Sequence, residues 1–193
     1  AYSRIDTVQG KYLELFKKAG INWLAVGIEA ANQNIRLEIT KGSFKNINIT
    51  DTVRLIEKSG VHVMANYIFG LPEDTHQTME ETTNLALELN TATANFYPCQ
   101  ALPGSPLYHQ AKKSGWEIPE NPNEFAFLSY ECKPLPTKYL TSAEVLKYRD
   151  VAWVKYFSNP KYLDLVEKLF GTESRNNVVD LTKIKLKRKI LGD

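Results

Sequence analysis

The stretch Val63-Met-Ala-Asn-Tyr-Ile-Phe-Gly-Leu-Pro-Glu-Asp-Thr75 joins an apolar run to the start of a helix, and it decides the fold. The run up to Phe69 is typical of a strand, and the Gly-x-Pro turn ends it. Asp74 or Thr75 can cap the helix that follows, because either side chain can accept hydrogen bonds from its first amides. Gly70 leaves room for a ligand against the backbone. Since open α/β sheets bind ligands at the carboxyl ends of their strands, this segment predicts a binding site.

Similar strand-then-helix units precede and follow this stretch. Residues 21–28 form a short, almost wholly apolar run, which is typical of a parallel strand that is covered on both faces. Thr50 or Asp51 can cap a helix that runs to Lys58. Because the connections are only a few residues long, we expect a parallel sheet with its helices on a single outer face. The predicted strands are 24–28, 63–69 and 94–97, and the predicted helices are 11–19, 29–39, 51–59 and 75–90.

This alternation stops after about residue 116. Prolines set among aromatic residues over 116–136 predict an ordered but irregular connection. Two helices are then expected at 142–157 and 160–170, where they form an α-helical appendage. The lysine-rich run at 183–189 is most simply a solvated basic tail. The two expected parts of the chain are 1–115 and 116–193.

Composition and charge narrow the function classes. A formal charge of +2 over 193 residues gives no indication of nucleic acid binding. No apolar run approaches the roughly 20 residues needed to span a membrane, and no signal peptide opens the chain, so we expect a cytoplasmic protein without a membrane partner. Cys99 and Cys132 are then expected to be reduced and structural. Since the chain starts at Ala1 and residues 3–8 look like the end of a strand, we expect a piece of a longer protein.

Three predicted strand ends carry related motifs: Val26-Gly-Ile-Glu-Ala-Ala31, Asn66-Tyr-Ile-Phe-Gly-Leu-Pro-Glu73 and Phe96-Tyr-Pro-Cys-Gln-Ala-Leu-Pro-Gly-Ser-Pro-Leu-Tyr108. In this order they resemble the radical S-adenosylmethionine (SAM) superfamily over about residues 1–115. The first is similar to a fourth-strand Gly-Ile-Glu pattern that Lys41-Gly42 closes, and the third to the turn after the sixth strand. The second resembles the fifth-strand motif, with Asn66 in place of its leading glycine. The resemblance implies the carboxyl-terminal half of a partial (β/α)6 barrel, similar to a TIM barrel.

The resemblance also implies a site for the nucleoside of SAM. Glu29 would accept hydrogen bonds from the ribose diol, Ile68 would lie against the adenine, and Gly70 would let the backbone approach it. Residues 97–102 would offer main-chain groups to the adenine edge. The residue types leave alternatives open, because Glu29 could cap the next helix, Ile68 could be core, and the Asn66 amide could face substrate or a neighbouring backbone group. The implied cofactor-binding residues are Glu29, Asn66, Ile68, Gly70, Tyr97 and Leu102.

The cluster that the superfamily uses has no ligands in this sequence. Its [4Fe–4S] cluster is held by a Cys-x3-Cys-x2-Cys loop, whereas this chain has only Cys99 and Cys132. We therefore expect the cluster ligands to lie in a missing amino-terminal half, which would be the main partner of this chain. Members with similar strand patterns also carry a cobalamin domain, so cobalamin is a further expected cofactor of the longer protein.

The expected function is a fragment of a radical SAM iron–sulfur enzyme, either an oxidoreductase or methyltransferase-like, that is inactive by itself. Its small-molecule substrate and catalytic residues are not identified by the sequence. One alternative is a TIM-barrel lyase or aldolase fragment that uses Glu29 and Lys41 as acid and base. Another is a non-catalytic scaffold that binds a partner protein through an open strand edge. A half barrel also leaves its inner face uncovered, so self-association is expected.

Overall fold

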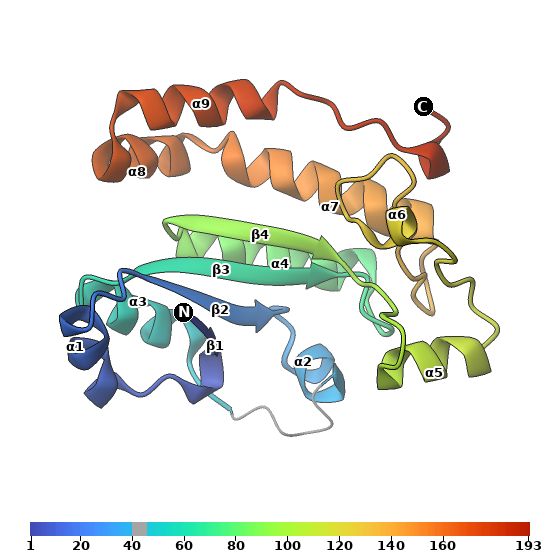
Figure 1. Cartoon of the computed structure of the whole chain (residues 1–193), viewed down its shortest axis with the longest axis horizontal. Coiled ribbons are helices and arrows are strands. Elements are labelled where there is room, and N and C mark those ends of the chain that lie inside the picture. The colour runs from blue at the N-terminus through green and yellow to red at the C-terminus, as the bar shows by residue number, and fades with distance from the viewer. Residues whose placement is uncertain (40–45) are drawn as a thin grey trace.

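Four parallel strands form one sheet in a computed structural model that describes residues 1–39 and 46–193. The strands follow one another across the sheet in chain order, and each pairs in parallel with the next (Figure 1). This arrangement confirms the parallel α/β fold that the strand-then-helix alternation predicts. Lys41 and Gly42 lie outside the described residues. The strands are β1 (Tyr2–Arg4), β2 (Trp23–Glu29), β3 (His62–Phe69) and β4 (Thr93–Pro98).

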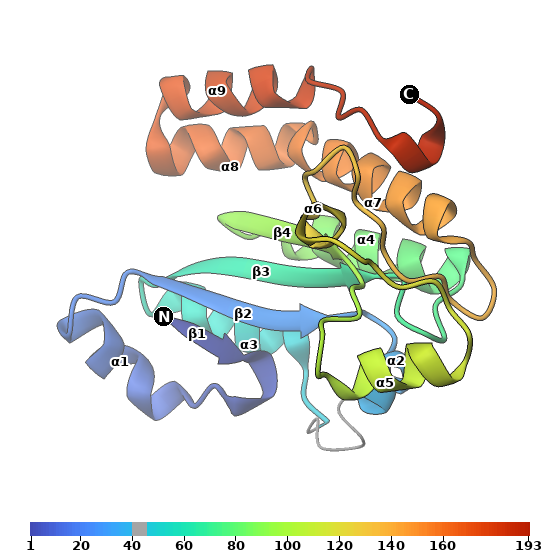
Figure 2. The same ribbon diagram turned by 45° about the vertical axis from the view of Figure 1, so that its right-hand side comes forward.

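Helices α3 and α4 cover one face of the sheet, as expected for the outer face of a barrel (Figures 1 and 2). Alternate residues of β3 are fully buried against them, while the residues between are half-buried on the inner face. The helices of this part are α1 (Gly10–Lys18), α2 (Gln33–Ile39), α3 (Ile49–Lys58), α4 (His76–Leu89) and α5 (Pro106–Lys113), and the short η1 (Ile5–Thr7) follows β1.

The helix caps only partly follow the sequence prediction. Thr75 caps α4, and its hydroxyl accepts a hydrogen bond from the amide of Thr78. The predicted caps of α3 are wrong, because the helix begins before Thr50 and the Asn48 side chain accepts from the amide of Asp51 at 3.1 Å. Asp74 instead holds the turn after β3, where its carboxylate accepts from the amides of Gly70 and Leu71.

The carboxyl-terminal part is helical and packs on the same core. Helices α7 (Ser142–Phe157) and α8 (Pro160–Phe170) confirm the two predicted helices, and their buried side chains belong to the hydrophobic cluster that the strands build. A third long helix, α9 (Thr172–Thr182), follows them and was missed because polar residues dominate it. The short elements α6 (Pro122–Phe125) and η2 (Lys189–Leu191) complete the described chain. None of the described helices is long and apolar enough to cross a membrane.

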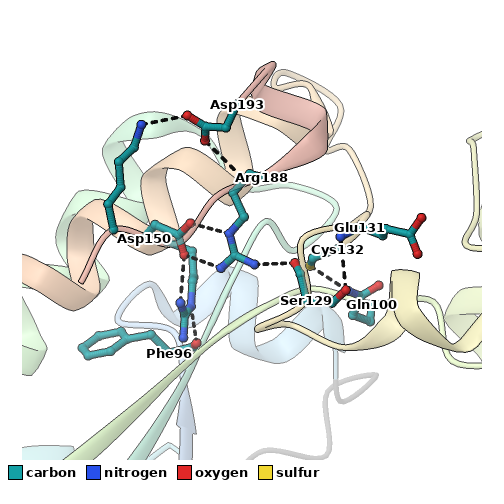
Figure 3. Close-up of polar contacts among 10 residues, drawn as sticks. Phe96, Gln100, Ser129, Glu131, Cys132, Asp150, Arg188 and Asp193 are labelled. Carbon is teal, nitrogen blue, oxygen red and sulfur yellow. Dashed lines mark hydrogen bonds and ion pairs between the residues drawn. The ribbon is translucent and has the colours of Figure 1, made fainter. Parts of the chain in front are cut away.

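The lysine-rich segment after α9 is not a solvated tail. It runs back along α7, and Arg188 within it is fully buried (Figures 1 and 3). The Arg188 guanidinium donates to both carboxylate oxygens of Asp150 on α7 and to the carbonyl of Ser129, each at 2.8 Å. The segment is therefore tied to α7 and to the irregular connection, which corrects the prediction from charge alone.

Candidate functional site

A pocket of about 480 Å³ opens on the inner face at the carboxyl ends of the strands. Its position is the one expected for ligand sites of parallel sheets. Four of the six predicted site residues line it together: Glu29 from β2, Asn66 and Ile68 from β3, and Tyr97 from β4. Their assignment to a cofactor stays a prediction, but the strand register does bring their side chains to one site.

Gly70 and Leu102 do not line this pocket. Gly70 has a φ of +80°, and the place that a β-carbon would take is occupied by the side chain of Val145 on α7. The room that the glycine provides is thus filled by a helix of the chain itself. Leu102 follows the pocket-lining end of β4, and its side chain is 58% exposed.

Glu29 has the most unusual backbone of the site. Its φ of +68° is rare for a residue other than glycine, and the amide of Ala30 donates to the carbonyl of Ile28 across it, which closes a tight γ-turn. The register of β2 against β3 also shifts between Gly27 and Glu29. This turn aims the Glu29 side chain back over Gly27, where a β-carbon would collide with the Glu29 Oε1 atom.

The strained turn is held from two sides. Arg36 of α2 donates from Nη1 to the carbonyls of Ala30 at 2.6 Å and Ala31 at 2.5 Å. The hydroxyl of Thr82 on α4 accepts from the amide of Ala31 at 3.0 Å. Several hydrogen bonds to one turn can hold its backbone in a strained conformation, and residues with strained backbones cluster at functional sites.

The Glu29 carboxyl is half-buried, and no described residue donates a hydrogen bond to it. Burial raises its pKa to about 7, and the positive charge of Arg4 offsets this only in part. No hydrogen bond to the carboxylate comes from the part of the chain that the structure describes. The alternative role as a helix cap does not hold, because the Asn32 side chain accepts from the first amides of α2. Glu29 thus offers two acceptor oxygens to whatever enters the pocket.

The other predicted residues of the pocket supply one amide and apolar walls. The Asn95 amide donates to Oδ1 of Asn66 at 2.9 Å, so the asparagine that replaces the leading glycine of the fifth-strand motif is bound to its register partner on β4. Ile68 is half-buried on the inner face. The Tyr97 ring meets Phe127 edge-on, with ring centroids 5.1 Å apart. Sequence reasoning missed Asn95, which does not line the pocket but holds the Asn66 side chain from the same face of β4 as Tyr97.

The two cysteines do not form a cluster site. Both are free and buried, and burial raises the pKa of Cys99 to about 12 and that of Cys132 to about 11, so both are thiols at neutral pH. Among the described residues there is no group of three or more histidine, cysteine or acidic side chains that could hold a metal ion. The two buried thiols therefore do not provide the clustered thiolates that an iron–sulfur cluster requires.

Parts of this chain are similar in sequence to known proteins. Residues 2–86 match the model of the radical SAM superfamily. An uncharacterized methyltransferase of Pyrococcus horikoshii is 28% identical over 163 residues, which cover 84% of this chain and 35% of the relative. The anaerobic magnesium-protoporphyrin IX monomethyl ester cyclase of Rubrivivax gelatinosus is 31% identical over 100 residues, covering 52% of this chain and 18% of the cyclase. The chain spans about a third or less of the length of these curated relatives.

A solved structure shows the same fold. The radical SAM methyltransferase TsrM of Kitasatospora setae, with cobalamin and a [4Fe–4S] cluster bound, matches with a TM-score of 0.54 at 19% identity. The match covers 64% of this chain and 24% of TsrM. The parallel sheet with its outer helices therefore has the TIM-barrel-like α/β fold that the sequence predicts, with a helical part after it.

Proposed function

We propose, because residues 2–86 belong to the radical SAM superfamily, that this chain supplies the nucleoside-binding half of the barrel of a longer radical SAM enzyme. Members of the superfamily are enzymes that use SAM and a [4Fe–4S] cluster. When bound, that cluster supplies the electron for reductive cleavage of SAM. What the residues of this chain contribute is the binding and orientation of the nucleoside part of SAM.

The observation that carries this proposal is the Glu29 carboxyl. It is held in a strained turn, its charged form is destabilised by burial, and no described residue donates to it. A ribose diol offers two hydroxyl donors, which is what two unsatisfied carboxylate oxygens need. Ile68 and the Tyr97 ring give the apolar walls that an adenine needs beside that ribose.

The cluster ligands, in this proposal, belong to residues that this chain does not contain. Two buried thiols cannot replace three clustered thiolates. The isolated chain should therefore neither hold the cluster nor cleave SAM, and the open edge at β1 is where a preceding strand of the barrel would pair.

A methyl-transfer reaction is the more specific part of the proposal. The relative that aligns with 84% of this chain is named a methyltransferase, and a relative that aligns with 52% of it is named a cyclase. Cobalamin would then be bound by another part of the longer protein. Methylated product from the longer protein, supplied with SAM and cobalamin, supports this reaction, whereas SAM cleavage without methyl transfer contradicts it.

The test of the nucleoside site is the pH dependence of SAM binding in that longer protein. Donors from the ribose stabilise the ionised carboxylate, so binding should release a proton and tighten as the pH rises from 6 to 8. Glu29→Gln should weaken binding by about 1 to 3 kcal/mol and flatten the profile. Glu173→Gln, on exposed α9, is the matched control. Unchanged affinity and an unchanged profile in Glu29→Gln would remove Glu29 from the site.

A further inference from the structure

A second, larger groove lies between α7 and the returning carboxyl-terminal segment. We call residues 183–193 the strap and this space the strap groove. Its volume is about 1060 Å³, at the upper end of the roughly 300–1,000 Å³ that is usual for small-molecule sites. The groove is larger than the inner-face pocket, and neither the predicted site nor the proposed nucleoside contacts explain it.

The walls of the strap groove are apolar side chains that a soluble protein usually buries. On α7, Val151 and Val154 are three residues apart on one helix face and are 57% and 40% exposed. Opposite them, Ile184 and Leu186 of the strap line the groove at alternate positions of an extended segment. Exposed apolar side chains gathered in one groove are typical of a binding site.

The strap is a fixed wall of this groove. Arg188 ties it to Asp150 and to the Ser129 carbonyl, and the Asp193 carboxylate accepts from the Arg188 amide (Figure 3). Asp150 is bound in turn by Arg149, whose Nε donates to the carbonyl of Phe96 on β4 at 2.7 Å. The groove is thus preformed, which lowers the entropic cost of binding a ligand there.

Unpaired positive charge borders the apolar walls. Lys147 and Lys155 extend from α7 at the groove, and neither has an ion-pair partner among the residues that the structure describes. Lys185 is already paired with Asp193 at 2.8 Å, and Asp150 is neutralised by two guanidinium groups. The charge left over at the groove is therefore positive and complements an anionic group on an apolar molecule.

The strap groove also meets the inner face of the sheet. Asn95 lines the groove, and its amide is bonded to Asn66 of the inner-face pocket. One pair of side chains therefore connects the groove with the proposed nucleoside site.

We infer that the strap groove binds the substrate of the proposed enzyme, and that this substrate is a large apolar molecule with an anionic group. The apolar body lies between Val151, Val154 and the strap, and the anionic group lies at Lys147 and Lys155. This inference rests on the proposed function for the identity of the ligand as a substrate. The binding itself rests only on the groove.

Two matched dyes test the groove on the chain itself. Anilinonaphthalene sulfonate has an apolar body and one anionic group, while phenylnaphthylamine has the same rings without the charge. Both should bind with saturation and accept excitation energy from Trp153, which lines the groove, so Trp153→Phe should remove most of the transfer. Val151→Asp should weaken both dyes at least tenfold, because it places a carboxylate on the apolar wall. Leu169→Asp, at an exposed position of α8 outside the groove, should change neither.

The lysines separate charge recognition from apolar binding. Lys147→Gln with Lys155→Gln should weaken the anionic dye about three- to tenfold in low salt, leave the neutral dye unchanged, and lose its effect in high salt. Lys161→Gln with Lys168→Gln on α8 is the control pair. Equal effects on both dyes would overturn the anionic part of the inference, and dye binding that ignores Val151→Asp would overturn the site.

A second copy of this chain in the strap groove would give a different result from a small molecule. A dimer that Val151→Asp converts to a monomer in sedimentation would mean that a second copy of this chain fills the groove, which overturns the inference. Because no measurement here uses SAM, failure of the groove leaves the nucleoside site standing. Conversely, if Glu29→Gln did not change SAM binding, the nucleoside site would be wrong, but dye binding to the strap groove would not be affected.

Discussion

Replacing Arg188 by methionine should release the strap, because this one buried side chain makes three hydrogen bonds from the strap to the rest of the protein. The guanidinium is fully buried and donates three hydrogen bonds of 2.8 Å, two of them to the Asp150 carboxylate. Breaking a buried ion pair by removing one partner costs about 3 to 5 kcal/mol. Asp150 keeps Arg149 at 2.8 Å and is 23% exposed, so we expect the lower end, about 3 kcal/mol.

Two measurements follow this change. Urea denaturation at neutral pH reports the free energy of unfolding, and trypsin reports local release, since the strap carries several lysines that docking protects. Arg188→Met should lower the free energy of unfolding and speed trypsin cleavage in the strap. Lys187→Met, at the exposed neighbouring position, should leave both the free energy of unfolding and the cleavage rate unchanged. A loss below about 1 kcal/mol together with unchanged cleavage would refute the role given to Arg188.

Three other predictions concern stability. The raised pKa of Glu29 means that the folded chain holds a proton that the unfolded chain loses near the ordinary pKa of 4.5, so stability should fall as the pH rises from 4.5 to about 7 and stay low above it. Glu29→Gln should remove this pH dependence and stabilise the folded chain at pH 8 by up to about 3 kcal/mol. A variant that is less stable than the unchanged chain at pH 8 would contradict the raised pKa. Gly70→Ala should cost about 2 to 4 kcal/mol in urea denaturation, because of its positive φ and the Val145 side chain, and Val145→Ala should recover part of the loss; additive effects of the two changes would refute the contact. Asn48→Ala should lower the stability measured in thermal melts by about 1 kcal/mol, and Thr50→Ala should change it very little. A larger loss in Thr50→Ala would mean that Thr50, and not Asn48, caps α3.

The sheet could be predicted from the sequence because its signals are local. Apolar runs of strand length, each followed within a few residues by a helical pattern, leave few topologies open. The same period of two that buries Tyr67 and Phe69 places Asn66 and Ile68 on the inner face, so four of the predicted site residues meet in one pocket.

What the sequence could not show depends on contacts between distant residues. The positive φ of Glu29 is held by Arg36 and Thr82, and neither residue marks a turn by its type. A residue larger than glycine would not fit at position 70, because Val145 packs against the backbone there, and no local sequence pattern links the two residues. In the strap, alternating lysines look like a solvated charge run, and only the structure shows that Arg188 meets Asp150.

The bond between Arg149 and the Phe96 carbonyl gives the sheet one blocked and one open edge. At β4 the guanidinium occupies an acceptor that an added strand would need, and α7 runs beside that strand (Figure 1). Within the described part of the chain, β1 is therefore the edge left for strand addition. With a single free edge, pairing between copies joins β1 to β1 about a two-fold axis and stops there. Strand addition between copies of this chain alone should therefore stop at two chains, whereas in the longer protein that we propose a preceding strand would cover the same edge.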